Sequence, residues 1–93
     1  MAIQHHSYVD GKVQSLGFSD QEHGDMTVGV IAEAGEYDFG LAEQREMIVV
    51  ITGAIIYNRR IYRARHSFIF GKGAEIKFLT EGPTSYLCIY LDD

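Results

Sequence analysis

Basic side chains gather in one short stretch of an otherwise acidic chain. Arg59, Arg60, Arg63 and Arg65 lie within seven positions. If residues 61–65 form a strand, alternation places Arg63 and Arg65 on the same face. Two guanidinium groups on one face suit a bidentate clamp for an oxyanion such as phosphate. The competing interpretation is a solvated strand face balanced by Asp and Glu.

A further basic residue, Lys72, lies between two glycines in the segment Gly71-Lys72-Gly73. The segment resembles a phosphate-binding loop only weakly, because such loops are longer and open a helix. The competing interpretation is a hairpin turn. Lys72 is therefore a candidate phosphate contact alongside the arginines, on weaker grounds.

The spacing of Glu46 and Gly53 is similar to part of the first metal-binding motif of cupins, which are small β-barrel proteins. That motif also needs two histidines, and this chain has Leu41 and Glu43 in their places. The second motif would supply another histidine near residues 71–76, which contain none. Transition metals prefer imidazole or thiolate ligands. We therefore expect a barrel with no bound metal and no other cofactor.

Nucleophilic catalysis is not indicated by the sequence. The single cysteine, Cys88, lies between Leu87 and Ile89, where a thiol usually acts as a small buried hydrophobic side chain. Ser85 has no obvious histidine partner to activate it. The histidines are elsewhere in the chain, at His5, His6, His23 and His66.

Composition narrows the class of protein. Ninety-three residues are enough for one domain with one core. Eight basic residues against thirteen acidic ones give a net charge of −5, which argues against nucleic-acid binding. No apolar run is long enough to span a membrane, and residues 1–10 do not read as a signal peptide. We therefore expect a cytoplasmic protein without a disulfide.

Short apolar or alternating runs, separated by turn residues, account for most of the chain. This pattern is typical of an all-β sandwich or barrel with eight to ten strands. We expect residues 1–93 to form a single domain, with residues 1–10 as a peripheral N-terminal segment and a turn at Asp10-Gly11. The polar segment Gly17–Asp25 is expected to be a loop. Expected strands cover residues 12–16, 26–33, 36–39, 46–52, 54–57, 61–65, 67–70, 75–79 and 84–91.

The last strand has two apolar faces, so it needs cover on both sides. We expect one face to line the barrel interior and the other to pack outward against the second sheet or a partner subunit. The expected inward set is Tyr86, Cys88 and Tyr90, and the outward set is Leu87, Ile89 and Leu91.

Several segments together resemble the pyrimidine/purine nucleoside phosphorylase family. The resemblance runs from about Gly11 to Leu91, which is nearly the whole chain. It rests on Lys12-Val13, Ser15-Leu16, Phe18, Val28-Gly29-Val30, Gly35-Glu36-Tyr37-Asp38-Phe39, Glu46-Met47-Ile48-Val49, Gly53, Pro83-Thr84-Ser85-Tyr86-Leu87-Cys88 and Tyr90-Leu91.

The resemblance implies a cytoplasmic all-β cupin-type jelly-roll barrel that is a homodimer and requires no metal. It implies phosphate-dependent cleavage of several purine and pyrimidine nucleosides to free base and ribose 1-phosphate. The chain departs from the family pattern at a short Asn58–Arg60 turn, in having no Trp, and at Gly71 where proline is usual. These positions border the expected barrel mouth and bear on the substrate range.

Phosphorolysis needs a cradle for phosphate, stabilisation of an oxocarbenium-like ribose and a proton or hydrogen bond for the departing base. Polar residues on the matching strands are the candidates. Those expected to be catalytic are Glu46, Tyr37 and Tyr86. Those expected to bind substrate are Glu36, Arg63, Arg65, Lys72 and Tyr90.

Each candidate residue is expected to contact one part of the substrates. Phosphate would be held by Arg63, Arg65 or Lys72. The ribose hydroxyls would be bound by Glu46 or Glu36. Aromatic stacking tolerates many bases, and the tyrosines expected to stack on the base or assist it are Tyr37, Tyr86 and Tyr90.

Two other functions remain open. A non-catalytic cupin would bind a nucleoside, a sugar or another small ligand without turnover. A metal-dependent cupin oxygenase or isomerase would contain iron, manganese or zinc, which the missing histidines disfavour. The partners expected for the phosphorylase are nucleosides, inorganic phosphate and a second copy of the chain, since pairing would cover apolar strand faces.

Overall fold

The computed structural model describes residues 2–8, 13–20 and 24–91, which form ten strands and, within these ranges, no helix. The all-β expectation is therefore confirmed, while the predicted Asp10-Gly11 turn and His23 lie outside the described residues. The strands are β1 (Ala2–Tyr8), β2 (Val13–Asp20), β3 (Gly24–Ile31), β4 (Gly35–Leu41), β5 (Arg45–Thr52), β6 (Ala54–Tyr57), β7 (Arg60–Arg63), β8 (Ser67–Phe70), β9 (Glu75–Thr80) and β10 (Thr84–Leu91).

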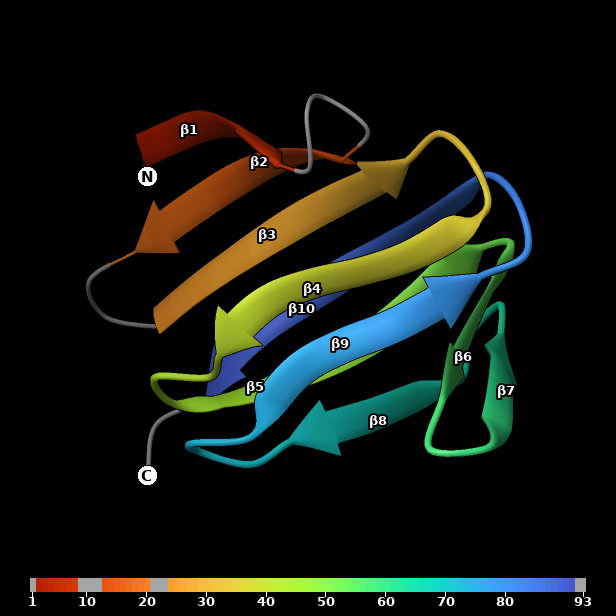
Figure 1. The fold of residues 1–93 in the computed structure, drawn as a ribbon. Coiled ribbons are helices and arrows are strands. Elements are labelled where there is room, and N and C mark those ends of the chain that lie inside the picture. Colours follow the sequence, from red (N-terminus) through yellow and green to blue (C-terminus); the bar gives the residue numbers. More distant parts are fainter. Residues whose placement is uncertain (1, 9–12, 21–23, 92–93) are drawn as a thin grey trace.

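The strands form two antiparallel sheets (Figure 1). The larger sheet has the order β1-β2-β3-β10-β5-β8, and the smaller has the order β4-β9-β6-β7. In the larger sheet β10, the last strand of the chain, lies between β3 and β5. This central position pairs β10 along both of its edges.

Alternation along the strands produces the core between the two sheets. In β9, Ile76, Phe78 and Thr80 are buried while the residues between them are exposed. β8 shows the same alternation, with Phe68 and Phe70 buried. Each such strand turns one face toward the opposite sheet and the other toward solvent.

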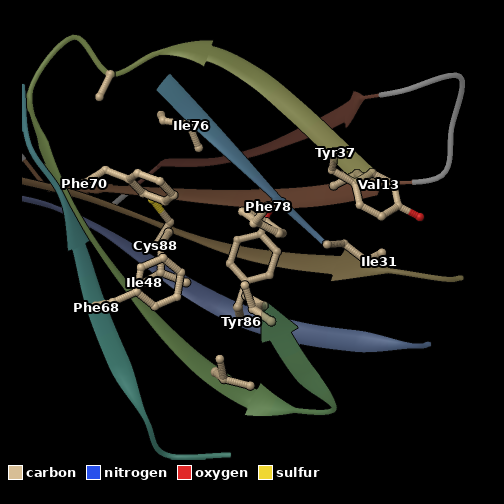
Figure 2. Packing of buried hydrophobic residues seen from close by; sticks show 13 residues of the cluster. Val13, Ile31, Tyr37, Ile48, Phe68, Phe70, Ile76, Phe78, Tyr86 and Cys88 are labelled. Atoms are coloured by element: carbon tan, nitrogen blue, oxygen red, sulfur yellow. The ribbon is translucent and has the colours of Figure 1, made fainter. Parts of the chain in front are cut away.

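The buried side chains form one cluster that draws on both sheets. Figure 2 shows Tyr37 beside Val13 and Ile31 in one part of the cluster. The same view groups Phe68, Phe70, Ile48 and Cys88 in another part, with Phe78 and Tyr86 between the two groups. The rings of Phe78 and Tyr86 meet edge to face, with their centroids 5.9 Å apart.

The N-terminal half differs from the sequence expectation in one segment. The expected loop Gly17–Asp25 is wrong, because β2 continues to Asp20 and β3 begins at Gly24. Their ladder pairs residues 13–20 with residues 24–31 throughout. Residues 2–8 form β1, which is the outermost strand of the larger sheet. Hydrogen bonding between strands therefore holds polar residues in extended structure here.

The chain passes from the larger sheet to the smaller one at Gly53. This glycine has a φ of 76°, a conformation that residues with a Cβ rarely adopt. A Cβ at this position would overlap the carbonyl oxygen of Pro83 and the Thr84 side chain. The buried Thr84 hydroxyl donates to the carbonyl oxygen of Ala54, at 3.3 Å, and so links the start of β6 to the start of β10.

The predicted tight turn after β6 is confirmed. Asn58 and Arg59 both have positive φ, of 52° and 65°, and Tyr57 pairs with Arg60 across them. These features define a two-residue hairpin of the primed type. The turn therefore projects Arg59 at the tip of the β6–β7 hairpin.

The expected strand over residues 61–65 is wrong at its C-terminal end. β7 ends at Arg63, and Arg65 has a φ of 72°. The strand stops there because the Arg63 amide donates a hydrogen bond to the Nδ1 atom of His66, at 3.1 Å. Arg63 and Arg65 therefore do not share one strand face, and the expected bidentate clamp is not formed by alternation.

Across the described ranges, no helix has the length and apolar composition of a membrane span.

Candidate functional site

A cavity of about 550 Å³ opens between the two sheets. Its apolar wall consists of Phe39, Leu41, Ile48, Ile76 and Phe78. Its polar and aromatic lining consists of Thr27, Glu43, Gln44, Glu46, Tyr86, Cys88 and Tyr90. A cavity of this size and mixed lining is typical of sites for small molecules.

Strand β10 supplies three of these side chains because alternate residues face the same way. Tyr86, Cys88 and Tyr90 all line the cavity, so the inward face expected from the sequence is confirmed. A β-bulge between β10 and β5 sets the pairing, because Ser85 pairs with Thr52 while Tyr86 pairs with Val50. Without the bulge, inward residues of β10 would lie beside outward residues of β5.

The ring of Tyr86 lies across Gly29 on the neighbouring strand β3. The two residues are cross-strand partners, and a Cβ on Gly29 would overlap the ring and hydroxyl of Tyr86. Tyr86 itself is buried. The absence of a side chain at Gly29 therefore fixes the position of an aromatic wall of the cavity.

Replacing Gly29 with alanine should lower the free energy of unfolding by about 1–3 kcal/mol, because the new methyl group displaces a packed ring. In the Tyr86→Ala background the same change should cost much less, since the obstructing ring is gone. Urea unfolding of the four proteins in this double-mutant cycle measures the coupling. Equal costs in both backgrounds would show that the ring does not lie over Gly29.

Glu46 is the buried carboxyl of the cavity, with 7% of the residue exposed. Cys88 Sγ donates a hydrogen bond to its Oε1 atom at 3.1 Å. Burial raises the pKa of Glu46 above its ordinary value, the hydrogen bond from Cys88 lowers it, and the nearby charge of Glu43 raises it again. The net shift is upward, which favours the protonated acid.

Thr27, Cys88 and Tyr90 lie next to Glu46 in the cavity lining, with Thr27 as the cross-strand partner of Cys88 and Tyr90 as that of Glu46. Burial is the main cause that raises the pKa of both the Cys88 thiol and the Tyr90 phenol. Both groups therefore stay neutral at physiological pH. A neutral, buried thiol is a poor nucleophile, in agreement with the sequence interpretation of Cys88.

The cavity mouth is built by two adjoining turns. The amide of Ala42 donates to the carbonyl oxygen of Ala74, and the amide of Gly73 donates to that of Ala42, both at 2.8 Å. The first turn carries Glu43 and Gln44, which line the cavity. The second turn carries Lys72, which is exposed next to the mouth but is not among the lining residues.

A β-bulge in β4 shapes the same rim. The pairing with β9 shifts between Asp38 and Leu41, where Gly40 has a φ of 86°. The Asp38 side chain accepts a hydrogen bond from the Gly40 amide at 2.9 Å. The bulge lies between Phe39, which lines the cavity, and the exposed Leu41 at its rim.

Three of the eight catalytic and substrate-binding residues that were predicted from the sequence lie together in the structure. Glu46, Tyr86 and Tyr90 line one cavity. Tyr37 is 2% exposed, and its hydroxyl donates to the carbonyl oxygen of Glu33 at 2.6 Å. It belongs to the core and is not among the cavity-lining residues.

The other predicted site residues lie on the surface. Glu36 forms an ion pair with Lys77 at 2.8 Å. Arg63 and Arg65 are exposed around the end of β7. Figure 1 shows the β6–β7 hairpin at the opposite end of the barrel from the two turns of the mouth. None of these three residues lines the cavity.

The cavity lining is acidic. It contains Glu43 and Glu46, and none of its residues in the described part of the chain is Lys or Arg. The same ranges contain no group of three or more His, Cys, Asp or Glu side chains placed to hold a metal ion. Glu43 and Glu46, which occupy part of the cupin metal-motif frame, therefore do not form a ligand set there.

Sequence reasoning missed Thr27, Gln44 and the pairing of Cys88 with Glu46. The alternation of β10 already placed Cys88 on the same face as Tyr86 and Tyr90. What was missing was the register between β10 and β5, which brings the thiol to the carboxyl. No signal in the sequence indicated Thr27, because its place depends on the pairing of β3 with β10.

Known proteins share both the sequence pattern and the fold. A family model described as pyrimidine/purine nucleoside phosphorylase matches residues 3–90. A protein of unknown function from Vibrio parahaemolyticus is 32% identical, with a TM-score of 0.85, over 98% of this chain and 100% of that one. A protein of unknown function from Acinetobacter sp. ADP1 is 20% identical, with a TM-score of 0.77, over 95% and 90% of the two chains.

The fold is also that of cupins. A cupin superfamily protein from Desulfitobacterium hafniense DCB-2 has a TM-score of 0.71 at 12% identity, over 87% of this chain and 78% of that one. At this identity the likeness concerns the fold alone. The expected cupin-type jelly-roll barrel is thereby confirmed.

Proposed function

Because the chain belongs to the pyrimidine/purine nucleoside phosphorylase family, we propose that it is a cytoplasmic enzyme that cleaves purine and pyrimidine nucleosides with phosphate. The products would be the free base and ribose 1-phosphate. One observation supports this function most strongly. A buried carboxyl with a raised pKa, Glu46, lies in a cavity whose walls include Tyr86 and Tyr90.

Glu46 is the proposed general acid. The carbon–nitrogen bond breaks, its electron pair leaves with the base, and the base takes the proton of Glu46. A phosphate oxygen forms the new bond to the anomeric carbon. The proton that hydrogen phosphate loses in this step returns to Glu46, so that the acid is regenerated. A carboxyl with a raised pKa suits this role near neutral pH.

The aromatic residues are proposed to hold the base. Tyr86 and Phe78 form an edge-to-face pair in the cavity wall, and Tyr90 lies four residues further along β10. Stacking on aromatic rings discriminates little between bases. Such a wall supports a broad range of nucleosides. Thr27 and Gln44 add hydroxyl and amide groups that can bind the ribose hydroxyls.

Phosphate is proposed to bind at the cavity mouth. Lys72 is the candidate, because the turn that carries it is hydrogen-bonded to the turn that carries Glu43 and Gln44. The acidic lining disfavours a phosphate placed deeper in the cavity. We assign no phosphate contact to Arg63 or Arg65, since both lie around the hairpin at the other end of the barrel.

The proposal is tested with purified protein and uridine, adenosine or inosine, each with and without inorganic phosphate. Chromatography should detect free base only when phosphate is present. Omission of enzyme and omission of phosphate are the two controls. Absence of phosphate-dependent base release from all three nucleosides would reject the phosphorylase function.

A second candidate is a non-catalytic cupin that binds a nucleoside, a sugar or another small ligand. It is favoured by the cavity lining, which in the described residues contains no cation to hold phosphate. Calorimetric titration with the same nucleosides separates the two functions. Saturable binding without release of base would support the second candidate.

We also propose a homodimer formed through the outer face of the larger sheet. Two rows of apolar residues cross this face from strand to strand. Val30, Ile51 and Ile69 on this face are exposed. An apolar face of this extent is typical of a protein interface. The rows consist of Val28, Leu87 and Val49, and of Met26, Ile89, Met47 and Ile69.

Light scattering should give twice the 10.5 kDa mass of one chain for the wild type. Leu87→Glu, at the centre of the face, should give the mass of one chain because it would bury a charge at the interface. Leu79→Glu, on the outer face of the smaller sheet, is the matched control and should remain dimeric. Circular dichroism checks that both variants fold. A monomeric wild type would reject the dimer.

A further inference from the structure

We infer that Cys88 is a positioning residue for Glu46: its S–H group holds the Oε1 atom, which leaves Oε2 as the oxygen that gives a proton to the departing base. The inference rests on the proposed phosphorolysis for its catalytic consequence. The geometric part concerns the free protein and can be tested there. It assigns a role to a cysteine that sequence reasoning takes for an ordinary core residue.

The contact is short, buried and held by the backbone. Cys88 Sγ lies 3.1 Å from Glu46 Oε1, and the two residues are 5% and 7% exposed. Tyr90 pairs with Glu46 and Cys88 pairs with Ile48, so thiol and carboxyl come from neighbouring positions of paired strands. Both lie on interior strands of the larger sheet. The strand pairing therefore fixes the backbone positions from which thiol and carboxyl meet.

The Cys88 thiol has Thr27 as its cross-strand neighbour on β3 and Tyr90 two residues along β10, and all three side chains line the cavity with Glu46. Because burial keeps the thiol protonated, it can act as a donor to Glu46. A thiolate in this position would instead repel the carboxylate.

This hydrogen bond distinguishes the two oxygens of a protonated carboxyl. The carbonyl oxygen of a carboxylic acid is a better acceptor than its hydroxyl oxygen, so the oxygen that accepts from the thiol is the one without the acidic hydrogen. The acidic hydrogen therefore belongs on Oε2. A proton placed on one defined oxygen is already positioned for transfer, which is how orientation contributes to catalysis.

Few other ionisable groups affect Glu46. Cys88 acts from β10 and Glu43 from the turn before β5, while the neutral Tyr90 phenol on β10 is not among the groups that shift the pKa of Glu46. β8 contributes Phe70 as its cross-strand partner and β3 contributes Thr27 near the thiol, neither of which is charged. Arg45 precedes Glu46 on β5 and is exposed. Of the two side chains that change the pKa of Glu46, Cys88 alone lowers it.

The test compares Cys88→Ala with Cys88→Ser. Both replacements remove the large sulfur atom, but only serine keeps a donor. Cys88→Ala should lower kcat by about tenfold, the expected effect of one lost hydrogen bond, with a smaller change in KM. Cys88→Ser should restore most of this loss. Equal losses in the two variants would overturn the inference, because packing alone would then explain them.

The pH profile supplies a second readout. Catalysis requires protonated Glu46, so kcat should fall as pH rises through the pKa of that group. The thiol lowers this pKa. Its removal in Cys88→Ala should therefore move the fall in kcat to higher pH, and serine should move it back. An unchanged profile in Cys88→Ala would contradict the inference.

A measurement on the free protein separates this inference from the proposed function. Carbon NMR of labelled glutamate carboxyls follows the titration of Glu46, which the spectrum of Glu46→Gln identifies by its missing signal. The midpoint should be higher in Cys88→Ala than in wild type, and close to wild type in Cys88→Ser. This result would support the contact even if no nucleoside is cleaved. Identical midpoints in all three proteins would reject it.

Discussion

Replacement of Glu46 by glutamine should lower kcat for phosphorolysis by about a hundredfold to ten-thousandfold, the usual contribution of a general acid. Glutamine has nearly the same shape and keeps a carbonyl oxygen that can accept the hydrogen bond of Cys88. It cannot deliver a proton to the base. The loss should therefore appear in kcat, with KM for the nucleoside changed much less.

A matched control is available on the opposite sheet. Glu75 lies on β9 and is exposed, and Glu75→Gln makes the same substitution outside the cavity lining. It should leave kcat within about twofold of the wild-type value, as is usual for surface substitutions. If Glu46→Gln retained full kcat, or if both variants lost it equally, Glu46 would not be the acid.

Glu46 should also affect how the stability of the protein depends on pH, which can be measured without substrate. Burial raises the pKa of Glu46 in the folded state above the ordinary value of 4.5. The folded protein therefore binds this proton more tightly than the unfolded chain. Its contribution to stability is present at low pH and is lost as pH rises from about 4.5 through the folded-state pKa. Glu46→Gln should lack this pH-dependent loss.

Replacement of Gly53 by alanine should lower the free energy of unfolding by about 2–5 kcal/mol. Two costs add at this position. An L-residue in the left-handed conformation costs about 1–2 kcal/mol, and overpacking costs about 1–3 kcal/mol. The overpacking arises because the methyl group meets the backbone of Pro83 and the Thr84 side chain, which β10 holds in place. Chemical unfolding followed by circular dichroism measures the effect.

Two other glycines separate these costs. Gly73 has a φ of 83° but open space around a Cβ, so alanine there should show only the conformational cost. Gly71 has open space and no positive φ, so alanine there should be neutral or slightly stabilising. If Gly53→Ala lowered the free energy of unfolding by no more than Gly73→Ala, the close approach of Pro83 and Thr84 to Gly53 would be refuted.

The fold was largely predictable because most strands show a strong local pattern. Residues 75–79 alternate clearly, and the buried positions of β9 follow that alternation. The Asn58-Arg59 turn was readable from turn chemistry. The segment Gly17–Asp25 was not, because its polar residues favour a loop and only the ladder between β2 and β3 holds most of them extended. Such long-range pairing has no local signature.

The site was predictable to the extent that it depends on alternation. Tyr86 and Tyr90 share a face of one strand, and that face lines the cavity. Glu46 followed from the family pattern. Arg63 and Arg65 were given too much weight as phosphate-binding residues. A cluster of charges in the sequence does not indicate at which end of the barrel a hairpin lies. The contact between Cys88 and Glu46 depends on a bulge between β10 and β5, and a register shift of one residue cannot be read from either strand alone.

Phosphorus NMR of the protein with uridine and inorganic phosphate tests the proposed reaction most directly. A new phosphate-ester signal for ribose 1-phosphate is expected, which grows at the same rate as free uracil and in equal amount. Glu46→Gln should slow both together. Release of uracil without a phosphate ester would indicate hydrolysis, and the absence of both products would contradict the account.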